Sequence, residues 1–226
     1  IVHIYILYSS NYKTLKMSET VEESLKLNPT ETALILIEYQ NEFTTEGGKL
    51  HDAVKEVMEA TGMLENSKKL MDTMRSSKCK IFHCPILYDL EHSEIGKNPY
   101  GILAGVKEGK AFQEGEWGGA ICDVMKPSKG DTIVKGKNGL CAFKSTNLDF
   151  ILRQNEIKNI VLGGFLTNCC VESTMRTAYE NGYRVYTLKD CCAATSMAAH
   201  EAAIEHTFGM FSIPTTSAEV AAAVSI

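Results

Sequence analysis

The chain has 226 residues, of which 44% are apolar, so it is long enough to bury a sizeable core and is predicted to form one large α/β domain. Its 28 acidic and 23 basic residues give a formal charge of −5 without any long basic run, which argues against nucleic-acid or membrane partners. The eight cysteines are too sparse for a disulfide scaffold and include two adjacent pairs. They predict a reducing, cytoplasmic compartment.

The first ten residues are apolar, but no basic residue precedes them and no small-residue cleavage site follows. We therefore predict neither a secretory signal nor, in the absence of an 18-residue apolar run, a membrane span. Residues 1–30 are expected to form an N-terminal extension, partly disordered, and residues 31–226 the domain. An organellar targeting remnant is the alternative for the first 16 residues.

The first half of the domain is predicted to contain two strands, a helix and a long excursion. Residues 33–37 form a continuous apolar run, typical of a strand that is buried on both faces. Apolar residues at helical spacing over 52–76 predict one long helix, and 81–87 is a second strand. Residues 88–120 show no lasting period and are expected to have little regular structure. Excursions of this length are typically lids or interface loops.

The second half keeps the alternation of strands and helices. We therefore predict a doubly wound, mainly parallel sheet in a three-layer α/β/α fold, with its site beyond the carboxyl ends of the strands. The predicted strands are 131–135, 157–162, 184–188 and 211–214, and the predicted helices are 146–153, one that ends at Asn181-Gly182, 196–207 and a short alanine-rich segment at the end.

Three chemically active side-chain types follow predicted strands. Glu38 follows the first strand, Lys135 and Lys137 follow the third, and Cys170 lies where the fourth gives way to a helix. A helix start and a nearby ammonium favour a thiolate, so we expect a lowered pKa for Cys170. Glu38 could then accept the thiol proton and deliver it to a leaving amine. The alternative is a buried structural cysteine, a solvated carboxylate and surface lysines.

Three segments carry a resemblance to a known family. Residues 33–43 read A-L-I-L-I-E-Y-Q-N-E-F, residues 137–143 read K-N-G-L-C-A-F, and residues 164–174 read G-F-L-T-N-C-C-V-E-S-T. They resemble, in order, the motifs A-L-x-x-I-D-x-Q-N-D-F, K-x-x-x-S-A-F and G-x-x-T-D-x-C-V-x-x-T of the isochorismatase-like cysteine hydrolases. The resemblance covers the chain from about residue 32 to residue 216.

This resemblance implies a catalytic triad of Glu38, Lys137 and Cys170, with Lys135 as the alternative lysine. It also implies a cis peptide bond before the motif threonine, at Leu166-Thr167, and an oxyanion hole formed by the backbone amides of Leu166 or Thr167 and of Cys170. No cofactor is expected, and a homo-oligomer, dimer or tetramer, is predicted.

Several residues depart from the family pattern. Glu38 replaces an aspartate, so the carboxylate reaches one methylene further, and Asn168 and Cys141 replace an aspartate and a serine. Cys169 competes with Cys170 as the nucleophile, but the motif register and the helix start favour Cys170.

The family resemblance leaves several chemistries open. Asp89 and His92 lack the further histidine of the nicotinamidase metal motif, so no metal site is predicted. The full triad favours a metal-independent cysteine amidohydrolase that acts on a small amide, ureide or carbamoyl compound through a thioacyl intermediate. Alternatives are vinyl ether hydrolysis, as in isochorismatases, and a non-catalytic or redox-sensing protein. The expected pocket walls, for which core packing is the alternative, are Gln40, Phe43, Trp117 and Phe165.

Overall fold

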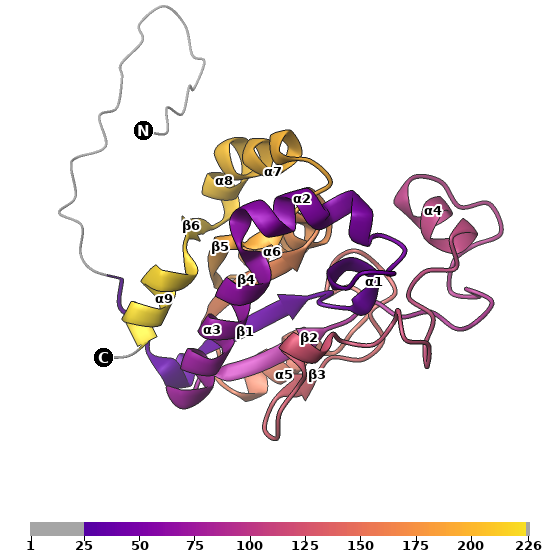
Figure 1. The fold of residues 1–226 in the computed structure, drawn as a ribbon. Helices are drawn as coiled ribbons and strands as arrows, with labels where there is room; N and C mark the ends of the chain where they lie inside the picture. Colours follow the sequence, from indigo (N-terminus) through magenta and orange to yellow (C-terminus); the bar gives the residue numbers. More distant parts are fainter. Residues whose placement is uncertain (1–24, 225–226) are drawn as a thin grey trace, which may run out of the picture.

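A computed structural model describes residues 25–224, which contain a six-stranded sheet whose neighbouring strands are all parallel (Figure 1). The strand order is β3-β2-β1-β4-β5-β6, so the direction of winding reverses between β1 and β4. Ligands in such sheets bind at this switch point. The strands are β1 Thr32–Ile37, β2 Lys80–Cys84, β3 Thr132–Ile133, β4 Asn159–Phe165, β5 Arg184–Ala193 and β6 Ile213–Thr215.

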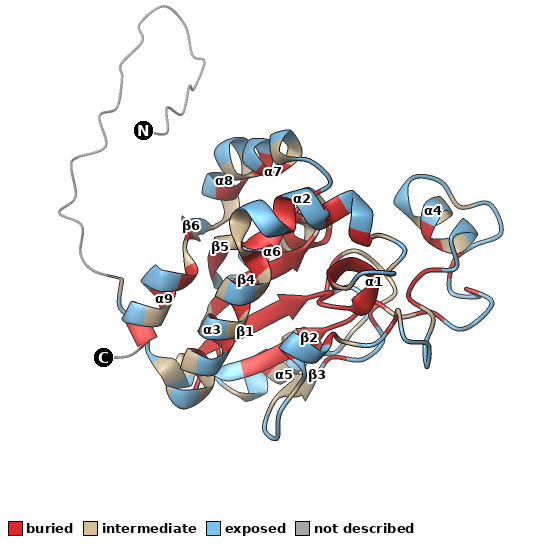
Figure 2. Ribbon diagram, in the orientation of Figure 1, coloured by how far each residue is buried: buried red, intermediate tan, exposed pale blue. Residues whose placement is uncertain are grey.

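Helices cover both faces of the sheet, which confirms the predicted three-layer fold (Figure 2). Leu34 and Leu36 of β1 pack with helices α2, α3 and α9 on one face, while Ile35 and Ile37 pack with α5 and α6 on the other. The helices are α1 Asn41–Thr44, α2 His51–Thr61, α3 Met63–Ser76, α4 Ile102–Glu108, α5 Leu148–Gln154, α6 Glu172–Glu180, α7 Met197–Ala203, α8 Gly209–Phe211 and α9 Ser217–Val224, with 3-10 turns at Pro29–Glu31 and Asp123–Met125 and π turns at Thr167–Val171 and Ile204–Phe208.

Several predicted segments differ from the structure. The single helix expected over 52–76 is broken at Gly62, whose φ of 64° is left-handed and ends α2 immediately before α3 begins. The excursion over 88–120 has little regular structure, as predicted, but it does contain α4. Part of the predicted N-terminal extension belongs to the core: Leu27 is buried, and its N–H donates to the Ala223 carbonyl. Residues 1–24 of that extension lie outside the described residues.

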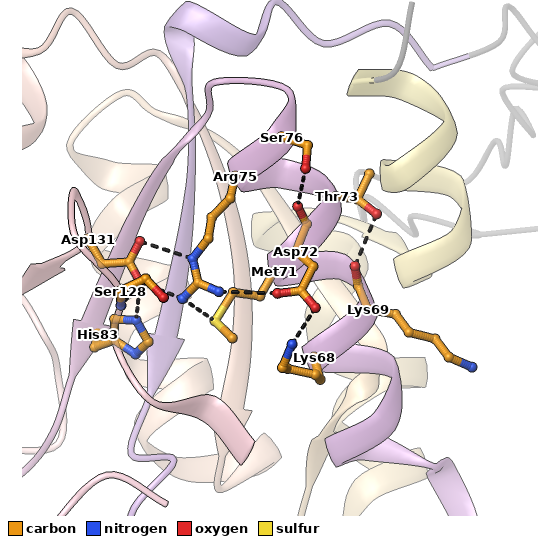
Figure 3. Close-up of polar contacts among 10 residues, drawn as sticks. All are labelled: Lys68, Lys69, Met71, Asp72, Thr73, Arg75, Ser76, His83, Ser128 and Asp131. Atoms are coloured by element: carbon orange, nitrogen blue, oxygen red, sulfur yellow. Dashed lines mark hydrogen bonds and ion pairs between the residues drawn. The ribbon is translucent and has the colours of Figure 1, made fainter. Parts of the chain in front are cut away.

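A polar cluster holds the short edge strand β3 against β2 and α3 (Figure 3). The Asp131 carboxylate accepts hydrogen bonds from the Arg75 Nε and from the Ser128 N–H, at 3.2 and 2.9 Å, and lies 3.2 Å from the His83 Nε2. The Asp131 side chain is 4% exposed, so these contacts are largely shielded from water. They fix the start of the segment that leads to Lys137, even though β3 has only two residues.

We predict that Asp131→Asn lowers the free energy of unfolding by about 1–3 kcal/mol at pH 7, because Arg75 loses its buried partner. Burial opposes the charged carboxylate, but Arg75, Ser128 and His83 outweigh it and lower the pKa of Asp131. A lowered folded-state pKa gives stability that is present above the unfolded value of about 3.9 and is lost as pH falls through the folded value.

Urea unfolding of both proteins measures this effect, with the exposed Asp123→Asn as the control. The difference from wild type is expected at pH 7 and should shrink below about pH 4. An equally large difference at pH 3 would contradict the assigned role of the ion pair.

Candidate active site

Glu38, Lys137 and Cys170 each follow a strand of the sheet and are almost fully buried. Glu38 directly follows β1 in a left-handed conformation, with φ of 59°, and its N–H donates to the Cys84 carbonyl at the end of β2. Lys137 lies in the loop after β3, and Cys170 lies in the π turn between β4 and α6. The turn after β1 therefore carries the carboxylate over the end of the sheet.

The end of β4 approaches β1 very closely at Gly164. Its φ of 139° is a backbone conformation that side chains rarely adopt, and a Cβ there would collide with the Ile37 carbonyl oxygen. Glycine is therefore required at this position. The close approach brings the strand that leads to Cys170 beside the strand that leads to Glu38.

The Lys137 ammonium donates hydrogen bonds to the Glu38 carboxylate and, at 2.9 Å, to the Gly139 carbonyl. Burial opposes the charge on Lys137, but the Glu38 carboxylate outweighs it and raises the pKa of Lys137. The lysine is therefore charged at neutral pH. The structure places Lys137 against Glu38. Lys135, the alternative lysine, is exposed.

Cys170 holds its proton more tightly than the sequence predicts. The hydrogen-bonding contact with Cys169, burial and the Glu38 charge all raise the pKa of the Cys170 thiol, and only Lys137 lowers it. The expected lowering is therefore wrong, because the Cys169 contact and burial outweigh the Lys137 ammonium, which is itself paired with Glu38. The same contact lowers the pKa of Cys169, which is partly exposed. Cys170, and not Cys169, lies on the cavity that Glu38 also lines.

This cavity has a volume of about 310 Å³ and an almost entirely apolar wall. Helices α2 and α4, the segments after β1 and β2, and the loops beside Lys137 and before Cys170 all contribute to it. Its lining residues are Glu38, Phe43, Leu50, Ala53, Val54, Ile86, Ile102, Leu103, Gly105, Val106, Phe112, Leu140, Leu166, Cys170 and Thr195.

The four expected pocket residues lie in different places. Phe43 lines the cavity, and Phe165 stacks on it with ring centroids 4.8 Å apart but is fully buried outside the lining. Trp117 is 52% exposed and borders two other hollows, so it lies outside this cavity. The Gln40 amide donates to the Ile86 and Gly119 carbonyls, each at 2.8 Å, and accepts from the Ile86 N–H. Gln40 therefore ties loops together and does not face the cavity.

The prediction of a cis peptide bond at Leu166-Thr167 is wrong by one residue. The cis bond is Phe165-Leu166, so the register of the motif placed it one position too late. The Leu166 carbonyl accepts the N–H groups of Cys169 and Val171, at 3.0 and 3.2 Å, and thereby closes the turn around Cys170. The Leu166 side chain lines the cavity. The Thr167 hydroxyl lies 2.8 Å from the Nδ1 of His200.

Several residues that the sequence reasoning missed shape the site. His200 of α7 holds the Thr167 hydroxyl, and burial lowers the pKa of this histidine, so it is neutral at pH 7. The α4 residues Leu103 and Val106 form one wall. The apolar pattern of residues 102–106 was the available signal for α4, but a helix of seven residues gives too little periodicity to be recognised.

Asp89 and His92 make their hydrogen-bonding contacts within the segment between β2 and β3. The Asp89 carboxylate accepts the N–H groups of Glu91 and Ser93, each at 2.9 Å. The His92 Nε2 lies 2.8 Å from the Ala111 carbonyl oxygen. Across residues 25–224, no group of three or more histidine, cysteine or acidic side chains is arranged to hold a metal ion.

We predict that Gln40→Ala destabilises the protein by about 2–4 kcal/mol, because it leaves the Ile86 N–H and two buried carbonyls without their partner. Urea unfolding measures the loss. Gln113→Ala is the matched control, since that amide makes one bond at a partly exposed site and should cost less than about 1 kcal/mol. Unchanged stability with a raised KM would instead place the Gln40 amide on the substrate.

Known proteins share both the sequence pattern and the fold. The isochorismatase domain model matches residues 32–219. The ureidoacrylate amidohydrolase RutB of Rhizobium rhizogenes is 32% identical over 179 residues, 74% of this chain and 72% of that protein. RutB of Agrobacterium fabrum is also 32% identical, over 74% of this chain and 78% of that protein.

Two solved structures have a fold similar to that of this chain. A cysteine hydrolase from Pseudomonas syringae pv. phaseolicola has a TM-score of 0.78 at 23% identity, over 91% of this chain and 99% of that one. The N-carbamoylsarcosine amidase from Thermoplasma acidophilum has a TM-score of 0.66 at 26% identity, over 83% of this chain and 96% of that one. With the domain match over residues 32–219, these likenesses show that the chain belongs to the isochorismatase family of hydrolases.

Proposed function

We propose that this protein is a cysteine hydrolase that cleaves the C–N bond of a small amide, ureide or carbamoyl compound. The observation that carries the proposal is a thiol and an ion-paired carboxylate on one small, largely apolar cavity. The names of the similar proteins, ureidoacrylate amidohydrolase and N-carbamoylsarcosine amidase, support the same type of bond. Metal independence stays a prediction.

The first step is attack by Cys170 on the substrate carbonyl carbon. The raised pKa means that Cys170 enters the reaction as a thiol, so its proton must leave as the sulfur attacks. The Glu38 carboxylate lies on the same cavity and accepts that proton. Lys137 remains charged and stabilises the negative charge that develops on sulfur.

The tetrahedral intermediate then expels the amine. Backbone N–H groups of Leu166, Thr167 and Cys170, in the turn after β4, are the proposed donors to the oxyanion. As the C–N bond breaks, Glu38 returns its proton to the departing nitrogen and a thioacyl enzyme remains. Glu38 next takes a proton from water, whose oxygen attacks the thioester carbon. The acyl product leaves, and the Cys170 sulfur recovers the proton.

Two predictions from the sequence concern the whole protein. A homo-oligomer, dimer or tetramer, and a cytoplasmic location stay predictions. Within residues 25–224, none of the helices has the length and apolar character needed to cross a membrane.

Replacement of each adjacent cysteine tests the nucleophile. We expect Cys170→Ala to abolish measurable ammonia release from a panel of small amides and ureas, because no thioacyl enzyme can form. Cys169→Ala is the matched control and should retain activity within a few-fold, since Cys169 is not on the cavity wall. Circular dichroism checks that both variants are folded. Loss of activity in Cys169→Ala alone would exchange the two roles, and turnover by Cys170→Ala would refute the mechanism.

Shortening the carboxylate tests the role of Glu38. In Glu38→Asp the carboxylate retracts by one methylene and loses its contact with Lys137, so we expect kcat to fall by about 10- to 100-fold. Glu38→Gln cannot accept the thiol proton, so its kcat should be lower by roughly 10³-fold or more. The exposed Glu56→Gln serves as the control. If Glu38→Gln kept wild-type kcat, Glu38 would not be the base.

A further inference from the structure

The walls of the active-site cavity offer no cation to a substrate. Apart from Glu38, Cys170 and Thr195, the described lining residues are apolar side chains and one glycine, and they include no lysine, arginine or histidine. Lys137 does not line the cavity, and its ammonium is already shared between Glu38 and the Gly139 carbonyl. The charge of the ion pair is therefore balanced before any substrate enters.

Cationic and imidazole groups on the elements packed against the cavity are engaged elsewhere. Lys49, next to the lining residue Leu50, contacts the Glu42 carboxylate and the Lys110 carbonyl. Lys107 of α4 donates to the Ile95 carbonyl at 2.9 Å, and the His51 Nδ1 lies 2.9 Å from the Phe43 carbonyl oxygen. Turning Lys49 or Lys107 into the cavity would cost these contacts.

Inside this cavity a substrate carboxylate would therefore lie against apolar walls without a cationic partner, close to the Glu38 carboxylate. Burying an unpaired carboxylate is strongly unfavourable, whereas apolar surface gains free energy when it leaves water. The walls from α2 and α4, with Val54, Leu103 and Val106, offer only apolar contact. A volume of about 310 Å³ is at the small end of ligand pockets, so the complementary group is compact.

We propose that the substrate is a small, uncharged amide or carbamoyl compound with an apolar substituent, and not a carboxylate-bearing one. This inference rests on the proposed function and narrows its substrate class. It also separates this chain from its relatives, since acrylate and sarcosine in their names denote carboxylates. The apolar substituent packs against α4, and the scissile carbonyl lies over Cys170.

Matched amides test the preference. Hexanamide and the monoamide of adipic acid present the same primary amide on chains of the same carbon number, and they differ in an uncharged or a carboxylate end. Ammonia release should give a kcat/KM at least 100-fold higher for hexanamide. Equal or faster turnover of the adipic monoamide would overturn the preference and leave the hydrolase function intact.

A second measurement does not depend on turnover. Iodoacetamide and iodoacetate differ mainly in charge, and each alkylates a cysteine by forming a carbon–sulfur bond as iodide leaves and the thiol proton is lost. Fragment-ion mass spectrometry separates labelling of Cys170 from that of Cys169, which is outside the lining and serves as the internal reference. We expect the rate ratio of iodoacetamide to iodoacetate to be at least 30-fold larger at Cys170. Similar ratios at both cysteines would refute charge exclusion.

A charge introduced into the wall should reverse the preference. Leu103→Lys places an ammonium on the α4 wall at a partly exposed position, where the substitution is compatible with folding. Leu103→Lys should lower the rate ratio of iodoacetamide to iodoacetate at Cys170 by at least 10-fold. Leu90→Lys makes the same change at a site that is 58% exposed and outside the lining, and it should leave the ratio unchanged.

These measurements separate the two proposals. If no amide is hydrolysed but the labelling ratio is large and falls in Leu103→Lys, the hydrolase function fails and the charge selectivity of the cavity stands. If both amides are hydrolysed equally and the labelling ratios match, the function stands and the selectivity fails.

Discussion

The buried contact between the Glu38 carboxylate and the Lys137 ammonium is the interaction on which the rest of the site depends. Moving two charges out of water is costly, so such a pair persists only when geometry and further hydrogen bonds compensate. Here the Gly139 carbonyl takes a second ammonium proton. The loop is fixed in turn by the Leu87 N–H, which donates to the Lys137 carbonyl at 3.1 Å, and by the Asn138 side chain. The Cys169 contact and burial keep Cys170 protonated, and the pairing of Lys137 with Glu38 leaves little net charge to oppose them.

The switch point of the sheet makes this arrangement possible. Reversal of the winding between β1 and β4 opens space beyond their carboxyl ends, and the close approach at Gly164 keeps the two ends together. The main chain therefore sets the spacing between Glu38 and Cys170. Glu38 stands in the position of the family aspartate, and its own backbone is in the left-handed conformation.

The sequence predicted the layers and the central strands because long apolar runs such as that of β1 are buried on both faces and leave a clear signal. It missed the helix break because a left-handed Gly62 does not interrupt the apolar period, and it missed α4 because one short helix has too little periodicity. The pKa of Cys170 depends on its contact with Cys169, on burial and on the Glu38 charge, which spacing along the chain does not reveal. The hydrogen bonds of Gln40 likewise depend on two loops distant in sequence.

The position of α4 separates part of the cavity wall from the layers that carry Glu38 and Cys170. This helix lies beyond α1, apart from the layers that carry Glu38 and Cys170, yet it supplies a wall of the cavity (Figure 1). On the proposed function, the groups that cleave the bond follow strands of the sheet, and the choice of substrate depends partly on the segment between β2 and β3. Such an enzyme can acquire new specificity through changes in one surface segment while its reaction chemistry stays the same.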